Sequence, residues 1–238
     1  MPNPPIRLLV HGATGRMGRA LLRLAAARPD VQVVAAVSRR VEQRVVDGVP
    51  RFAAKELAGT PAFDAAIDFS LPEGFDGVLA HCVQRGAAFV SGTTGLSDAQ
   101  RAALETAAAR IPVLWAANFS LGVAVLSALV ERAARELPGW DCDIVEVHHV
   151  HKQDAPSGTA LALGAAAQRG GAAPRYASLR AGDVVGEHTV QFAGLGERVE
   201  LVHRATDRDV FAQGALTAAA RVAAKPPGLY AMADLLGA

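Results

Sequence analysis

The chain has 238 residues, of which 51% are hydrophobic and 20% are charged, and its mean hydropathy is +0.21. This length and composition indicate a globular protein with one large domain or two small ones. The 24 basic and 23 acidic residues leave a net charge of only +1, which argues against a general nucleic-acid or membrane-surface binder.

The two cysteines indicate a reducing compartment. Cys82 and Cys142 both stand in apolar stretches, where we expect buried free thiols rather than a disulfide. The first five residues lack the basic and apolar regions of a secretory signal. No stretch approaches the roughly 18 apolar residues of a membrane span. We therefore expect a cytoplasmic protein.

The first half of the chain alternates short apolar runs with helical patterns. Strands are predicted at residues 6–10, 31–37, 65–69, 87–90 and 111–115. Helices are predicted at residues 16–27, after Pro72, and from Ser97, which forms a capping box with Gln100. Strands that alternate with helices predict an α/β fold with a Rossmann-like, doubly wound parallel sheet.

The pattern changes after Asn118. Helices are predicted at residues 121–137, 157–169 and 211–223, and strands at 143–149, 179–185, 188–192 and 197–203. The last three strands have no helix between them, which favours a smaller α+β domain with a mainly antiparallel sheet. We therefore expect two domains, one at 1–119 with a C-terminal return at 209–238, and a smaller one at 120–208.

Three glycines separate the first predicted strand from the first helix. Gly12, Gly15 and Gly18 follow a G-x-x-G-x-x-G spacing, a variant of the dinucleotide fingerprint that is compatible with the same geometry. Such a loop turns tightly and presents the N–H groups of a helix N-terminus to a pyrophosphate. A purely structural glycine-rich turn is the alternative interpretation.

The end of the second predicted strand bears on the choice of cofactor. NAD-preferring sites usually have an acidic residue there, which holds the ribose 2′-hydroxyl. This chain has Ser38, Arg39 and Arg40 instead, and guanidinium groups suit a 2′-phosphate. We expect NADPH as the cofactor, with NADH as an alternative hydride donor. A solvated basic turn is the other interpretation.

Residues 146–160 carry the candidate catalytic groups. Alternation along a strand places His148 on the face opposite Val147 and His149. Lys152 is one of only three lysines among the 24 basic residues. Unlike arginine, lysine releases a proton when its surroundings lower its pKa. A solvated edge strand remains an alternative interpretation of this histidine-rich run.

The same stretch also predicts a binding site for an anion. Ser157 is a natural N-cap, and Gly158 and Thr159 then offer N–H groups at a helix N-terminus, which suits a carboxylate. A proton donor beside such a cradle suits the reduction of a polar C=N or C=C bond by hydride from a nicotinamide. We expect no metal, because His148 and His149 point apart and no cysteine or paired carboxylate completes a set of ligands.

Residues 146–160 closely resemble the signature of the dihydrodipicolinate reductase family, also called 4-hydroxy-tetrahydrodipicolinate reductases, of the diaminopimelate route to lysine. The similarity covers nearly the whole chain and includes residues 12–18, 67–69, 92–95, 116–120 and 180–189. It implies a cyclic hydroxy-dicarboxylate substrate that loses water and accepts hydride from NAD(P)H, giving tetrahydrodipicolinate. The resemblance also implies a homotetramer built through the sheets of the second domain.

The resemblance further implies roles for particular residues. His148 matches the proton donor and acceptor, and Lys152 matches the second proton donor. His149, Gly158 and Thr159 match substrate-binding positions. Matches to cofactor contacts are Gly12, Ala13, Thr14, Gly15, Arg16, Met17, Arg39, Gly92, Thr93, Thr94, Ala116, Ala117, Asn118 and Phe119.

Two features depart from the family pattern. Ser38 stands where members that use NADH well often carry an acidic residue, and the segment 169–177 is shorter than in many members. Two other functions stay open. One is an NADP-dependent dehydrogenase of another small carboxylate, and the other is a non-catalytic dinucleotide sensor. The proton donor beside an anion cradle argues against the sensor.

Overall fold

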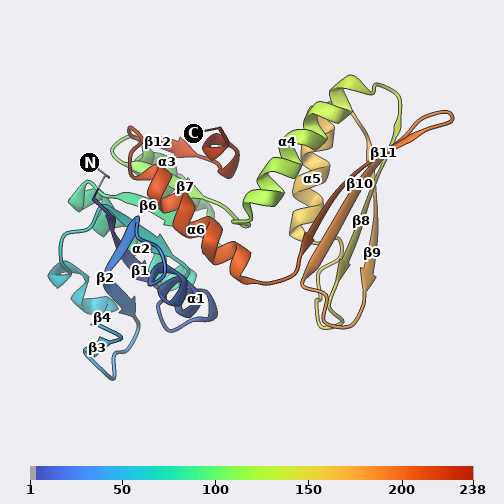
Figure 1. Cartoon of the computed structure of the whole chain (residues 1–238). Coiled ribbons are helices and arrows are strands. Elements are labelled where there is room, and N and C mark those ends of the chain that lie inside the picture. Colours follow the sequence, from blue (N-terminus) through green and yellow to red (C-terminus); the bar gives the residue numbers. More distant parts are fainter. Residues whose placement is uncertain (1–3, 238) are drawn as a thin grey trace. The chain divides into compact units, whose positions relative to one another are not determined.

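The computed structural model describes residues 4–237 and divides the chain into two compact units (Figure 1). The first unit runs up to Phe119 and resumes at Phe211, and the second comprises Ser120–Val210. The N-terminal part of the chain and its C-terminal segment therefore belong to one folded body.

An eight-stranded sheet forms the centre of the first unit. Its strand order is β12-β7-β6-β5-β1-β2-β4-β3. All neighbours run parallel except β3 and β4. The strands are β1 (Ile6–His11), β2 (Val31–Ser38), β3 (Val45–Val46), β4 (Val49–Ala53), β5 (Ala65–Asp68), β6 (Ala88–Ser91), β7 (Pro112–Trp115) and β12 (Gly228–Tyr230). Strand β2 lies on one side of β1 and β5 lies on the other. The strand order therefore reverses at β1, and parallel sheets of this kind bind ligands at such a switch point.

The helices of this unit begin and end at residues that the sequence marks clearly. They are α1 (Arg16–Ala25), α2 (Pro72–Arg85), α3 (Asp98–Ala108) and α6 (Asp209–Val222), with short 3₁₀ segments η1 (Ala54–Gly59) and η2 (Met232–Leu235). Ser97 Oγ accepts a hydrogen bond of 3.2 Å from Gln100 N, so the predicted capping box is present. Gly86 ends α2 with φ of +64°, a conformation that glycine adopts without strain.

Apolar strands form the core of the first unit. Leu9, Ile67, Phe89 and Val113 have no exposed surface. Nearly continuous apolar runs are typical of parallel strands that are covered on both faces. Burial of each such side chain contributes about 1.5–3 kcal/mol to stability. The core thus fixes the strands, and with them the loops at their carboxyl ends.

The second unit is a four-stranded sheet covered by two helices. Its strand order is β11-β10-β8-β9, and β10 runs antiparallel to both neighbours, whereas β8 and β9 are parallel. The elements are α4 (Leu121–Glu136), β8 (Asp141–His148), α5 (Gly158–Arg169), β9 (Pro174–Arg180), β10 (Gly186–Ala193) and β11 (Arg198–Ala205). Both helices lie on the same face of this sheet (Figure 1). The predicted fold class, an α/β sheet plus a smaller domain with a mainly antiparallel sheet, is confirmed.

One predicted strand is wrong, and three short strands were not predicted. The strand expected at 179–185 is β9, which ends at Arg180, and a turn with Gly182 at φ of +49° follows it. The apolar Val184 and Val185 suggested a strand, but the left-handed Gly182 breaks the extended backbone. Strands β3 and β12 were missed because they are too short to show a period, and β4 was missed because Pro50 and Arg51 interrupt its apolar residues.

Both cysteines are buried and free, as the sequence predicts. Burial raises the pKa of the Cys142 thiol to about 11 and raises that of Cys82 further, which leaves both thiols unreactive. Among the helices of residues 4–237, none has the length and apolar character needed to span a bilayer.

Candidate functional site

A hollow of about 1090 Å³ lies at the carboxyl ends of β1, β2 and β5. The glycine loop lines it with Gly12, Ala13, Thr14 and Gly15, and the end of β2 lines it with Ser38 and Arg39. The predicted dinucleotide loop and the predicted cofactor-selecting segment therefore face one cavity.

The glycine loop has no room for side chains where a pyrophosphate would approach the backbone. Gly12 has φ of +78°, and a Cβ there would lie less than 3.0 Å from the carbonyl oxygen of Phe69. A Cβ on Gly18 would lie equally close to the carbonyl oxygen of Gly12. No side chain caps α1, whose N-cap is Gly15, so its first N–H groups suit an anion. The loop fits a dinucleotide phosphate.

A group of arginines surrounds the end of β2. Arg19, Arg39, Arg40 and Arg51 all line the hollow, together with the acidic Glu42 and Glu73. Arg51 lies on β4, and its buried Nε has no hydrogen-bond partner among the described residues. Sequence reasoning missed Arg51 because β4 was not predicted. Guanidinium groups at this edge of the hollow suit the extra phosphate of NADPH, although that of Arg19 already donates to the carbonyl of Thr14 at 2.6 Å.

The buried carboxylate of Asp68 joins the ends of three strands beside the hollow. Its oxygens lie 2.8 Å from His11 Nδ1 and accept hydrogen bonds from Ser91 Oγ at 2.9 Å and Thr93 Oγ1 at 2.8 Å. Although burial raises the pKa of Asp68, its partners, led by His11, lower it overall, so the carboxylate stays ionised. Asp68 thereby fixes the loops after β1, β5 and β6.

The other predicted cofactor residues lie outside the lining of this hollow. Arg16 and Met17 begin α1. Gly92, Thr93 and Thr94 follow β6, and Ala116, Ala117, Asn118 and Phe119 follow β7. Thr93 is buried and hydrogen bonded to Asp68, whereas Thr94 and Ala117 are exposed. Trp115 Nε1 donates a hydrogen bond of 2.9 Å to the carbonyl of Thr93. These two loops are therefore neighbours at the carboxyl edge of the same sheet.

In the second unit, a buried carboxylate holds the predicted catalytic histidine. Glu146 and His148 are two residues apart on β8, so they share the face covered by the helices, and they are 0% and 8% exposed. His148 Nδ1 pairs with Glu146 Oε2. Arg180 Nη2, from β9, lies 2.9 Å from Glu146 Oε1. Glu146 and Arg180 were not among the predicted site residues.

The charge of Glu146 determines which nitrogen of His148 is free. Burial raises the pKa of Glu146, but Arg180, Ser178 and His148 lower it overall, so the carboxylate is ionised and only accepts hydrogen bonds. His148 Nδ1 must then donate, which leaves Nε2 to exchange a proton with a substrate. Burial lowers the pKa of His148 although Glu146 opposes it. A Cβ on Gly186 would lie 3.0 Å from Nε2, so this glycine keeps the nitrogen uncovered.

A second buried histidine packs against the first. The rings of His148 and His188 meet edge to face, with centroids 5.1 Å apart. His188 Nε2 lies 3.2 Å from Ser157 Oγ. Burial, and after it the charge of His148, lowers the pKa of His188 to about 4. His188 is therefore neutral at neutral pH and supports the position of His148 without adding a charge.

The strand ends before it reaches Lys152. β8 stops at His148, and a turn follows in which Lys152 N donates to the carbonyl of His149 at 3.1 Å. His149 thus lies in the turn and is partly exposed. The ammonium of Lys152 is 2.8 Å from Asp154 Oδ1 and lowers the pKa of that carboxyl. Lys152 is positioned by a turn and an ion pair rather than by strand alternation.

The N-terminus of α5 is the predicted anion cradle. Ser157 Oγ accepts a hydrogen bond of 3.1 Å from Ala160 N, and Ser157 is only 2% exposed. The hydroxyl therefore shapes the cradle as the N-cap of α5. Gly158 is exposed and Thr159 partly exposed in the first turn, where N–H groups and the helix dipole favour a carboxylate.

Three of these side chains also offer atoms that a metal ion would need. Ligand atoms of Glu146, His148 and His188 lie within 4.8 Å of one another. However, Glu146 is already paired with His148 and with the guanidinium of Arg180. A fixed positive charge at this carboxylate disfavours a cation. We therefore interpret the cluster as a hydrogen-bond network that orients His148.

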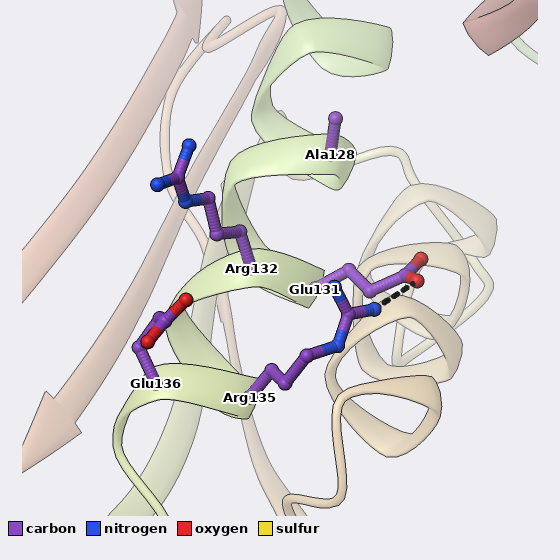
Figure 2. Close-up of a pocket in the computed structure, with 5 residues that line it drawn as sticks. All are labelled: Ala128, Glu131, Arg132, Arg135 and Glu136. Carbon is purple, nitrogen blue, oxygen red and sulfur yellow. Dashed lines mark hydrogen bonds and ion pairs between the residues drawn. The ribbon is translucent and has the colours of Figure 1, made fainter.

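A further hollow lies on α4 and contains none of the predicted site residues. Figure 2 shows Glu131 and Arg135 pointing toward each other, joined by an ion pair of 2.9 Å, while Arg132 points to the other side of the helix. Glu131 also pairs with Arg169 at 2.9 Å. Glu131 is thus paired with two arginines on the surface, and we interpret this hollow as a solvated helix face.

A Rossmann-like unit followed by an α+β unit with a protonatable histidine is typical of nicotinamide-dependent reductases. Residues 6–119 match the family model for the N-terminus of dihydrodipicolinate reductase, and residues 122–236 match the model for its C-terminus. The chain belongs to the dihydrodipicolinate reductase family, whose members are NAD(P)H-dependent oxidoreductases.

Curated relatives agree with this assignment, and a solved structure shares the fold. The chain is 71% identical over 238 residues to the 4-hydroxy-tetrahydrodipicolinate reductase of Stenotrophomonas maltophilia, covering 99% of this chain and 100% of the relative. It is 68% identical over 237 residues to that of Xanthomonas campestris, with coverage of 99% and 100%. A dipicolinate-bound dihydrodipicolinate reductase from Paenisporosarcina shares the fold, with a TM-score of 0.77, 21% identity, and coverage of 95% and 97%.

Proposed function

We propose that this chain reduces 4-hydroxy-tetrahydrodipicolinate with NADPH, with loss of water, to give tetrahydrodipicolinate in diaminopimelate and lysine biosynthesis. The observation that supports this proposal most strongly is the 71% identity over 238 residues to a 4-hydroxy-tetrahydrodipicolinate reductase. The chemistry at His148 supports it, because a buried histidine with a free Nε2 beside an anion cradle suits hydride addition coupled to proton transfer.

The two parts of the chain divide this work. Residues 1–119 with 209–238 bind the cofactor, whose nicotinamide supplies the hydride when bound. Gly12 to Met17 hold the pyrophosphate at the N-terminus of α1, and Ser38 and Arg39 face the adenosine ribose. Gly92 to Thr94 and Ala116 to Phe119 complete the cofactor site at the carboxyl ends of β6 and β7. Residues 120–208 bind the substrate and form the oligomer.

The second part orients the substrate and transfers protons. Gly158 and Thr159 hold a substrate carboxylate at the N-terminus of α5, with Ser157 shaping that turn and His149 adding a contact. His148 Nε2 delivers the proton to the carbon that gains negative character, and Lys152 is the second proton donor. Glu146 stabilises the protonated form of His148, because an ionised carboxylate favours an imidazolium.

Product analysis tests the reaction. The purified protein is incubated with NADPH and freshly formed 4-hydroxy-tetrahydrodipicolinate, and in parallel with other small carboxylates that contain a C=N or C=O bond. Mass spectrometry should detect tetrahydrodipicolinate only in the first mixture. Faster reduction of a different carboxylate would favour the alternative, an NADP-dependent dehydrogenase of another substrate.

The cofactor preference depends on the arginines around the end of β2. We expect Arg39→Ala to weaken NADPH binding about tenfold to a hundredfold, because hydrogen bonds to a charged group contribute about 1.5–3 kcal/mol. NADH, which lacks the 2′-phosphate, should bind with nearly unchanged affinity. Fluorescence titration of both nucleotides measures this, with Arg110→Ala as an exposed control and Arg51→Ala in parallel. Equal losses for both nucleotides would remove Arg39 from the 2′-phosphate site.

We propose that the protein is a homotetramer assembled through the second sheet. The face of this sheet opposite α4 and α5 carries Val145 and Val147 in register with Ala177 and Leu179, and Leu179 is 55% exposed. The same face also carries polar side chains, among them Asp143 paired with Arg175, and such a mixture of exposed apolar and polar groups is typical of an interface between subunits. Sedimentation equilibrium should give four times the mass of one chain, and a monomer at micromolar concentration would contradict it.

We also propose a cytoplasmic location. The two unpaired thiols support it, and cell fractionation tests it.

A further inference from the structure

We propose that Glu146 and Arg180 act together as positioning residues that set both proton donors, His148 and Lys152. This inference rests on the proposed reductase function, in which those two side chains deliver protons. Neither Glu146 nor Arg180 contacts the reacting atoms in that mechanism. Each acts through the groups that it holds.

Glu146 orients the ring of His148 from behind. The carboxylate has no exposed surface, and its two oxygens divide between separate partners. Oε2 pairs with His148 Nδ1, while Oε1 accepts from Arg180 Nη2 at 2.9 Å and from Ser157 N at 3.3 Å. The carboxylate therefore fixes the tautomer and the direction of the ring, as carboxylates do for histidines in other catalytic sites.

Arg180 joins this carboxylate to the turn that carries Lys152. Its guanidinium donates to the carbonyl of Lys152 at 3.3 Å and to the carbonyl of Asp154 at 2.5 Å, as well as to Glu146. The register pairs Arg180 directly with His148 across β8 and β9. One planar side chain with five N–H donors thus holds the strand end and the following turn together.

Charged and titratable groups on several elements affect the titration of His148, and the neighbouring His149 in the turn interacts with it as well. Glu146 on the same strand favours the imidazolium, whereas Lys152 on the turn and Arg180 on β9 disfavour it. His188 on β10 packs edge-on and is neutral at neutral pH, and His203 on β11 lies beyond it. Glu146 is therefore the only one of these groups that stabilises protonated His148, so its removal has a predictable sign.

The test uses Glu146→Gln, which keeps the shape of the side chain but removes its charge. We expect kcat to fall roughly tenfold or more, because the variant should lose part of the rate enhancement of about 10²–10⁴-fold that a general acid contributes. The change in KM should be smaller. NMR titration of the nucleotide-free protein should show the pKa of His148 below that of the unchanged protein. The limb of the pH–rate profile that reports His148 should move to lower pH by the same amount. Glu146→Asp should recover part of the activity.

Arg180→Lys tests the second half of the pair in a separate variant. Lysine keeps the charge but cannot bridge Glu146 and the carbonyl of Asp154 together, so we expect kcat to fall and KM to rise as the turn loosens. The matched controls are Glu131→Gln and Arg135→Ala, which break an exposed ion pair of 2.9 Å on α4 of the same unit. Both controls should stay within about twofold of the unchanged protein.

The outcomes separate this inference from the proposed function. If Glu146→Gln and Arg180→Lys behave like the controls while the unchanged protein turns over, the positioning role is wrong and the reductase function stands. If the unchanged protein does not reduce the substrate, the function is wrong. The NMR titration of His148 still decides whether Glu146 controls its proton.

Discussion

Replacing both His148 and Lys152 by alanine should lower kcat by at least about 10²–10⁴-fold, the range that a single general acid contributes. Hydride transfer to the ring leaves negative character on a neighbouring atom, and without a positioned proton that charge is not neutralised. NADPH affinity should be unchanged, because the cofactor loop belongs to the other unit. Stopped-flow oxidation and fluorescence titration measure the two quantities separately.

The matched control for this pair is His151→Ala. His151 lies in the same histidine-rich stretch but is exposed, so its loss should change kcat by no more than about twofold. A double variant that binds NADPH and still turns over like the unchanged protein would remove His148 and Lys152 from the chemistry. The buried His148 would then have a structural role, and other residues would supply the protons.

Gly12→Ala should destroy the cofactor site. A Cβ would lie less than 3.0 Å from the carbonyl oxygen of Phe69, and the backbone has φ of +78°. Strain and overpacking together cost on the order of 3 kcal/mol in the free energy of unfolding. The shifted loop should also lose NADPH affinity by more than about a hundredfold, because N–H groups at the helix N-terminus no longer meet the pyrophosphate. Urea unfolding and equilibrium titration measure both effects.

Gly48→Ala is the control for this variant, because it introduces backbone strain without a steric clash. Gly48 has φ of +75°, but a methyl group added there would meet no atom of the described residues within 4 Å. Its replacement should therefore cost only about 1–2 kcal/mol and leave NADPH binding intact. If Gly12→Ala binds NADPH as tightly as Gly48→Ala, the glycine loop does not hold the pyrophosphate.

Local sequence signals predicted the parts of the fold that local physics determines. The apolar runs at β1 and β5 are buried strands, and Ser97 and Ser157 cap helices as expected. Strand β9 was displaced by five residues because its exposed, polar sequence from Pro174 has no alternating pattern. Its place depends on parallel pairing with β8, a long-range contact that no local pattern reports.

The candidate site was predicted only where its residues stand close together in the sequence. His148, Lys152 and the helix that begins after Ser157 stand together in one short stretch, so a motif suffices to find them. Glu146 carried a usable signal, because residues two apart on a strand share a face. Arg180 belongs to the family-like stretch 180–189, but its contact with Glu146 depends on the register of β9, and Arg51 depends on the unpredicted β4.

The most direct test of the central claim measures the oxidation of NADPH in the presence of 4-hydroxy-tetrahydrodipicolinate. The substrate is formed in the cuvette by the synthase that joins pyruvate and aspartate semialdehyde. We predict rapid oxidation that requires the substrate, is slower with NADH, and is lost when His148 and Lys152 are both alanine. A folded protein that binds NADPH but oxidises none of it in this mixture would contradict the proposed reductase function.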